Sequence, residues 1–300
     1  MSDDRVDGAA QRRLDKLVEL FNLDRLDRDL FLGDPGEGER RLFGGLVAAQ
    51  AVVAAYETVD EGSLHSLHAY FLRPGRYDVP IRYVVYRIRD GRTFTTRDVV
   101  AYQAGEAIFS LASSFAKPEE GITHQQPMPD LPGPEGLPAW EFVRPDHHDA
   151  DHQHRRWWTD NPIELRSVDP WGTDWPDGMP RRRVWMRVRG TFPDREVIHA
   201  ALLTYASDRG VIATARMPHN ISRDPAQMGA SASLDHAIWF HYPPRFDDWL
   251  LYTSESPAAH SARALILGQV YRLDGTRVAS VAQEGLIRVG RGTSPPPSAK

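Results

Sequence analysis

Two polar islands interrupt the apolar C-terminal third of the chain. The stretch ASLDHAIWFH contains Ser233, Asp235, His236 and His241, and the stretch AQEG places Gln283 within an apolar run. The sequence contains no cysteine, no glycine-rich phosphate loop and no spaced set of metal ligands. Any chemistry must therefore rely on a carboxylate, a hydroxyl and an amide. These groups favour activation of water at a carbonyl over redox or phosphoryl-transfer chemistry.

Composition excludes several classes of protein. The chain has 300 residues, of which 41% are hydrophobic, so it has enough apolar surface for one large or two medium domains. A net charge of -5 gives no electrostatic reason to expect nucleic acid, and the acidic N-terminus lacks the apolar segment of a secretory signal. The longest apolar stretch, Leu46 to Tyr56, is too short to span a bilayer. We therefore expect a soluble, cytoplasmic protein without nucleic-acid partners or membrane insertion.

Apolar spacing predicts helices at three places, namely residues 12–22, 44–56 and 195–215. The last two are apolar on nearly every face, so other structure must wrap them. Each of these two is followed by a series of strand-like runs. The Asp-Gly pairs at 90–91 and 274–275 predict hairpin turns within those series.

A helix followed by a long antiparallel set of strands occurs twice, which indicates an internal duplication. The expected class is α+β with an antiparallel sheet. We place an N-terminal domain at 12–117, a Pro- and Gly-rich linker at 118–139, a C-terminal domain carrying the catalytic residues at 140–290 and a disordered tail at 291–300. Residues 29–43 are expected to form a charged, glycine-rich loop.

Long motifs in both halves resemble the type II acyl-CoA thioesterase family. They are RLFGGLVAAQAVVAA, SLHAYFLRPG and RDGRTFTTRDVVAYQ in the first half, then LTYASD, ASLDHAIWFH, WLLYTSES and VASVAQEG in the second. The resemblance covers nearly all of residues 14–290. It implies a double hot dog, in which each half has a central helix wrapped by a curved antiparallel sheet. It also implies hydrolysis of fatty acyl-CoA to free fatty acid and CoA, without a cofactor or metal, by a homo-oligomer.

The same resemblance implies a catalytic trio of Asp208, Ser233 and Gln283. Taken from the residues alone, each has a structural alternative. Gln283 could be a satisfied core amide, Asp208 a carboxylate at a helix end, and Ser233 an ordinary strand hydroxyl. Gly44 and Gly45 could let a helix N-terminus donate to a carbonyl oxygen, or could serve only close helix packing.

Several other sequence patterns give weaker support for a functional site. The segment HHDADHQH at 147–154 invites a metal site, but its polar surroundings favour a solvated loop. The segment GASAS at 229–233 misses the G-x-S-x-G nucleophile elbow, which disfavours a covalent serine hydrolase. Trp239 and Trp249 are expected in the core. Arg97 is one of several cations that could meet the phosphates of CoA.

As a hypothesis, water held by Asp208, Ser233 and Gln283 attacks the thioester directly. Two rivals remain open, a non-catalytic acyl-CoA-binding hot dog and an enoyl-CoA hydratase-type hot dog. Hydratase chemistry requires an Asp/His pair in one short loop, and the second-half helix has no such pair. We expect one site per chain, because the run 44–56 has no acidic residue and Ser113 stands where Gln283 would be repeated.

Overall fold

The computed structural model describes residues 8–38, 41–139, 162–169, 173, 175–216, 219 and 228–289. The expected loop at 147–154 and the expected tail at 291–300 lie outside the described residues. The helices are α1 (Gly8–Glu19), α2 (Gly44–Tyr56), α4 (Glu196–Ser207) and α5 (Ala213–Arg216). The strands of the first half are β1 (Asp24–Asp27), β2 (Leu30–Gly33), β3 (Ser63–Phe71), β4 (Ile81–Asp90), β5 (Phe94–Gln103) and β6 (Glu106–Ala116). Those of the second half are β7 (Ile163–Ser167), β8 (Arg181–Val188), β9 (Met228–Ser233), β10 (Asp235–Phe240), β11 (Leu250–His260), β12 (Arg263–Arg272) and β13 (Arg277–Val289).

Helices α2 and α4 form the centre of the molecule. Nearly every residue of both is buried, as their uniformly apolar sequences predict. They run antiparallel, since Gly45 at the start of α2 lies against the backbone of Tyr205 near the end of α4. At the opposite ends, the hydroxyl of Tyr56 donates to Glu196 Oε1 at 2.8 Å. The N-terminus of each helix therefore lies beside the C-terminus of the other.

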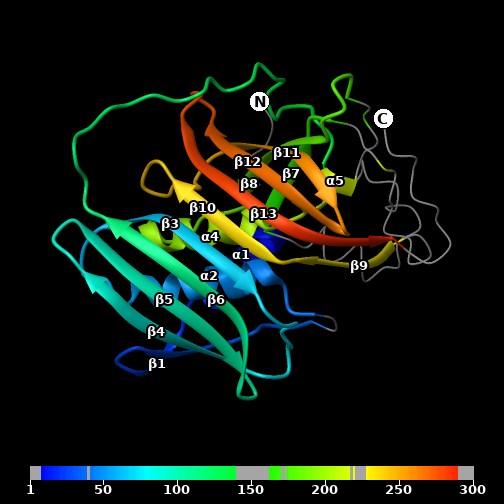
Figure 1. Cartoon of the computed structure of the whole chain (residues 1–300). Coiled ribbons are helices and arrows are strands. Elements are labelled where there is room, and N and C mark those ends of the chain that lie inside the picture. The colour runs from blue at the N-terminus through cyan, green and yellow to red at the C-terminus, as the bar shows by residue number, and fades with distance from the viewer. Residues whose placement is uncertain are drawn as a thin grey trace.

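One antiparallel sheet wraps both helices (Figure 1). Its strand order is β1-β2-β4-β5-β6-β3-β10-β13-β12-β11-β8-β7, with β9 paired to β13. The two halves meet where β3 pairs with β10, with His68 opposite Ala237. Both Asp-Gly hairpins are confirmed, between β4 and β5 and between β12 and β13.

Two expectations about local structure were wrong, and two strands were not predicted. Residues 29–43 are not all loop, because β2 lies within them and pairs with β1 and β4. The helical run at 195–215 is broken, because α4 ends at Ser207 and the turn before α5 contains Gly210, whose left-handed φ of 73° is incompatible with a continuing α-helix. Strands β7 and β8 were not anticipated, because consecutive arginines at the start of β8 obscure its alternation.

The linker expected at 118–139 lies against the second half. Met128, Leu131 and Leu137 pack on a small apolar cluster that contains Trp185 and Trp249. The indole Nε1 of Trp185 donates to the carbonyl of Pro132 at 2.9 Å. Figure 1 shows this segment as the long green trace that arches past β10 toward β7 and β8. Trp249 is buried as expected, and the linker supplies part of its cover.

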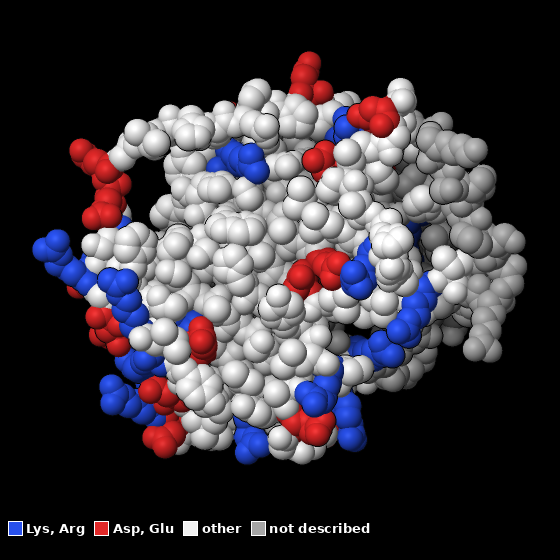
Figure 2. Space-filling view, viewed as in Figure 1, with Lys and Arg blue, Asp and Glu red and all other residues white. Residues whose placement is uncertain are grey.

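Trp239 is not in the core. It is 39% exposed on the outer face of β10, where it stacks edge-on against His68, and neighbouring Tyr70 is 61% exposed. Figure 2 shows a broad uncharged area over this part of the sheet, with Lys, Arg, Asp and Glu gathered mainly toward the rim. Alternation explains the error, because Phe240 points inward and is buried, so its neighbour must point outward.

Candidate active site

Asp208 caps the C-terminus of α4. The helix delivers the carboxylate to the surface of the core, where the residue is only 7% exposed. The hydroxyl of Tyr252 on β11 donates to the carbonyl of Ser207 at 3.3 Å and so helps to hold the last turn of α4. Burial raises the pKa of Tyr252, which therefore stays a neutral donor. The end of α4 is consequently a fixed support for the carboxylate.

A break in the sheet brings Ser233 to Asp208. Strands β9 and β10 both pair with β13, and Leu234 between them shifts the register by one residue. Ser233 Oγ donates to Asp208 Oδ1 at 2.8 Å. Gln283 extends from the middle of β13, fully buried, and its Nε2 donates to Ser233 Oγ at 2.8 Å. The three residues expected from the resemblance therefore form one continuous hydrogen-bonded set.

Two further residues, for which no role was predicted, complete this set. His236 Nδ1 lies 2.5 Å from Gln283 Oε1, and His236 Nε2 lies 2.8 Å from Ser207 Oγ. Both His236 and Ser207 are fully buried. Burial lowers the pKa of His236, against the opposing charges of Asp208 and Asp235, so the ring is neutral at pH 7. Their positions in the sequence could have indicated them, because His236 follows Ser233 within the same polar stretch and Ser207 directly precedes Asp208.

Asp235 has a structural task beside the set. Its Oδ1 accepts from the backbone N–H of Glu284 at 2.6 Å, at the point where the Leu234 break interrupts the ladder between β10 and β13. The carboxylate therefore replaces a missing strand hydrogen bond. It holds Gln283 and Ser233 in register without pointing its own oxygen at either of them.

Gly44 and Gly45 lie at the first turn of α2. A Cβ added at Gly45 would stand 2.8 Å from the carbonyl oxygen of Tyr205, and one at Gly44 would stand 2.5 Å from the ring of Phe71. Close packing against a backbone carbonyl therefore requires Gly45, whereas Gly44 is packed against a side chain. The same packing brings the N-terminus of α2, whose first N–H groups lack acceptors within the helix, next to the turn of α4 that ends in Asp208.

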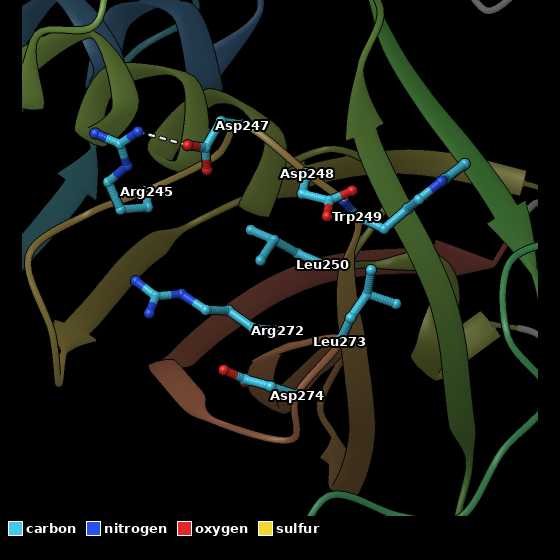
Figure 3. A pocket seen from close by; sticks show the side chains of 8 residues that line it. All are labelled: Arg245, Asp247, Asp248, Trp249, Leu250, Arg272, Leu273 and Asp274. Atoms are coloured by element: carbon cyan, nitrogen blue, oxygen red, sulfur yellow. Dashed lines mark hydrogen bonds and ion pairs between the residues drawn. The ribbon is translucent and has the colours of Figure 1, made fainter. Parts of the chain in front are cut away.

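Other candidates lie elsewhere. Arg97 is 1% exposed and is held by Thr58 and by Asp90, so it does not face a substrate phosphate. A surface hollow of about 220 Å³ opens beside Trp249 (Figure 3). Arg245 and Asp247 form an ion pair at its edge, at 2.5 Å. None of the lining residues belongs to the hydrogen-bonded set, so this hollow is separate from the candidate site.

Within the described residues, no group of three or more His, Asp or Glu side chains is arranged to hold a metal ion. Over the same residues, no helix is long and apolar enough to cross a membrane.

Similar proteins are known along most of the chain. Residues 34–116 match the model of the acyl-CoA thioesterase N-terminal domain, and residues 171–286 match the model of acyl-CoA thioesterase. The acyl-coenzyme A thioesterase 8 of Mus musculus is 36% identical, over 95% of this chain and 93% of its own. The acyl-CoA thioesterase 2 of Haemophilus influenzae is also 36% identical, over 92% of this chain and 98% of its own.

A solved structure agrees with these sequence matches. The acyl-CoA thioesterase II of Mycobacterium marinum superimposes with a TM-score of 0.77 at 35% identity, and the match covers 93% of this chain and 100% of that one. The expected double hot dog is thereby confirmed. With both halves matched in order and nearly the whole length covered, the chain belongs to the acyl-CoA thioesterase family, whose members are thioester hydrolases.

Proposed function

We propose that this chain hydrolyses fatty acyl-CoA to a free fatty acid and CoA, using Asp208, Ser233 and Gln283 to activate water. The observation that carries the assignment of these residues is their hydrogen-bonded order at the end of α4. The bond from Ser233 occupies Oδ1 of Asp208, which leaves Oδ2 as the oxygen that a water would meet. A carboxylate with one fixed and one available oxygen is suited to general base catalysis.

The proposed reaction begins with a water between Oδ2 of Asp208 and the thioester. Asp208 takes a proton from this water while the water oxygen bonds to the carbonyl carbon. The carbonyl oxygen becomes an oxyanion in the tetrahedral intermediate. When the carbonyl re-forms, the carbon–sulfur bond breaks and the CoA thiolate leaves. The proton held by Asp208 passes to the thiolate, which gives the carboxylic acid, free CoA thiol and regenerated enzyme.

Direct attack by Ser233 is less well supported. Gln283 Nε2 donates into a lone pair of Ser233 Oγ, and the hydroxyl proton points to Asp208. Donation into the lone pair lowers the electron density with which Oγ would attack. We therefore assign Ser233 the task of orienting Asp208 and its water, so no acyl-enzyme forms.

We assign stabilisation of the oxyanion to backbone N–H groups at Gly44 and Gly45. Their support is the antiparallel packing, which brings the start of α2 against Tyr205, three residues before Asp208. Helix N-termini favour negative charge, and donors of this kind typically contribute about 10²–10³ to a rate. The first half would then supply the oxyanion donors for a base held by the second half.

The hydratase alternative is disfavoured by His236. Both ring nitrogens of His236 are engaged, with Gln283 and with Ser207, so neither can exchange a proton with a substrate without breaking the set. The binding-only alternative differs from the enzyme in its products. Assay of free thiol released from acyl-CoA substrates of increasing chain length tests all three, because only the thioesterase releases thiol. Absence of thiol over every chain length, from folded protein, would exclude the proposed function.

Two further proposals concern the oligomeric state of the protein and its location in the cell. We propose a homo-oligomer, and the exposed Trp239 and Tyr70 on an uncharged stretch of sheet are the surface features in its favour. Light scattering after size exclusion tests this point, and a monomeric mass would refute it. We propose a cytoplasmic location on composition alone, and cell fractionation tests it.

A further inference from the structure

Five polar side chains at the C-terminal end of α4 are joined in one hydrogen-bonded series, the polar line, whose two terminal residues are consecutive in the sequence. In order they are Ser207, His236, Gln283, Ser233 and Asp208, joined by contacts of 2.8, 2.5, 2.8 and 2.8 Å. Only the Ser233 and Asp208 end approaches the surface, while the other three side chains are fully buried. Bulk solvent therefore does not reach these three side chains, so their hydrogen bonds must come from one another.

The line has a direction, which the Gln283 amide decides. An amide has a donor end and an acceptor end, and the two are nearly equal in shape. With Nε2 toward Ser233, the serine accepts, and its own proton must go to Asp208. With the amide reversed, Oε1 would face Ser233 and attract that proton away from Asp208. The base would then lose the hydrogen bond that fixes Oδ1.

The carboxylate of Asp208 only accepts hydrogen bonds, so it favours the first orientation, and the tautomer of His236 must match it. A neutral imidazole carries one N–H. If the proton is on Nδ1, His236 donates to Gln283 Oε1, and its Nε2 accepts from Ser207 Oγ. Ser207 also has an alternative acceptor, the carbonyl of Thr204 at 3.0 Å. The Nδ1–H form of His236 therefore requires Ser207 to donate to Nε2 and not to the carbonyl of Thr204.

We propose that His236 and Ser207 are positioning residues for hydrolysis, and that they act by holding the Gln283 amide with its donor toward Ser233. The inference rests on the proposed function for its kinetic consequence, but the hydrogen-bond direction stands apart from it. His236 does not touch substrate in this scheme. Its effect reaches the water through Gln283, Ser233 and Asp208.

Two substitutions of His236 by amide residues distinguish a positioning role of this side chain from a role in packing alone. His236→Asn places a donor near the position of Nδ1 and keeps the contact with Gln283. His236→Gln places its amide near the position of Nε2 and keeps the contact with Ser207 instead. Packing alone would favour the Gln variant, which is closer to histidine in volume. Positioning predicts the opposite rank, with kcat of the Asn variant about tenfold or more above that of the Gln variant, at similar KM.

A matched pair at His199 controls for burial. His199 is also 1% exposed in the second half, and its nitrogens meet Asp194 and the N–H of Phe246, not the line. The Asn and Gln variants of His199 should show no such rank in kcat. Equal kcat for the two His236 variants, or a faster Gln variant, would overturn the proposal.

The position of the proton on the His236 ring can be measured without an activity assay. Nitrogen-15 NMR of the side chains should show His236 as the neutral Nδ1–H form, with its signal assigned by its absence in His236→Asn. A charged ring or the Nε2–H form would overturn the proposed direction. If the wild-type chain released no thiol but kept the Nδ1–H form, the proposed function would fail while the hydrogen-bond direction held. In Ser207→Ala, Nε2 of His236 loses its hydrogen-bond partner, so a several-fold loss of kcat at similar KM is expected, and an unchanged kcat would contradict the role of Ser207.

Discussion

The C-terminal ends of α4 and α2 have similar backbone surroundings but different side chains around them. Ala237 pairs with His68 and with Ala282, while His68 pairs with Ala112, so the two halves correspond around this junction. Even the irregularity is repeated. The register shift that separates Ser233 from β10 matches a shift between Leu64 and Ser66 in β3. A register shift at the same place thus occurs in both halves.

The side chains at these equivalent positions differ. Gln283 corresponds to Ser113, His236 to Leu67 and Ser233 to Leu64. Asp208 corresponds to Glu57, which the sequence analysis missed because it lies one residue past the end of α2. The Glu57 side chain is 42% exposed and is ion-paired with Arg25. Both halves thus have a carboxylate at the helix end, and the two halves differ in the polar side chains behind it.

The largest effect is expected where the two ends look most alike. Asp208→Asn keeps the shape of the side chain and removes its charge, so kcat should fall about 10²- to 10⁴-fold with little change in KM. Glu57→Gln is the matched change in the first half and should leave kcat unaffected. Steady-state kinetics of both variants checks this. A comparable loss in Glu57→Gln would break the asymmetry.

Gln283→Ala tests whether the chain has one site or two. Without the amide, Ser233 and His236 lose their shared partner, and kcat should fall about 10- to 10³-fold because an oriented donor is lost. Retention of about half the activity would indicate a second, independent site. Titration with a non-hydrolysable acyl-CoA analogue should saturate near one equivalent per chain.

Ser233 sharpens the comparison with Leu64. Ser233→Ala removes both the donor to Asp208 and the acceptor for Gln283, and about a 10- to 10²-fold loss of kcat is expected from the two hydrogen bonds. Ser233→Thr keeps the hydroxyl and should retain most activity. Mass spectrometry of rapidly quenched turnover should show unmodified protein. An acyl adduct on Ser233 would replace water attack with covalent catalysis.

The outer edges of the sheet differ as well, with the smallest expected effect. Every residue of β1 is exposed, whereas Glu164 of β7 is buried among Arg166, Arg187 and Arg189. Burial opposes ionisation of Glu164, but the three arginines outweigh it and lower its pKa from 4.5 to about 2. Because the pKa is lowered in the folded state, this stabilisation is complete above about pH 4.5 and is lost as pH falls toward 2.

We expect Glu164→Gln to lower the free energy of unfolding by about 1–2 kcal/mol at pH 7, since the arginines are partly screened by solvent. The difference from wild type should shrink between pH 4.5 and 2, and kcat should not change. Urea unfolding at several pH values measures both quantities. A difference that stayed constant down to pH 2 would refute the ionic explanation.

Local patterns predicted much of this molecule. The run 44–56 gave the bounds of α2, because small apolar residues on every face fit only a wrapped helix. The resemblance brought Asp208, Ser233 and Gln283 together correctly in space. The hydrogen bond between Ser207 and His236 could not be predicted from the sequence, because it depends on the register of β10 and on where α4 ends. The exposure of Trp239 likewise depends on which face of the sheet the helices cover.

The pairing of β3 with β10 has a consequence during synthesis. In the finished molecule β3 is an interior strand, but in the first half alone it is an edge with unpaired N–H and C=O groups. Its partner leaves the ribosome only after all the residues between Phe71 and Asp235 have been added, which takes roughly 10 to 30 s at typical rates of translation. The nascent first half must therefore keep an open strand edge from pairing with other chains until its own second half arrives.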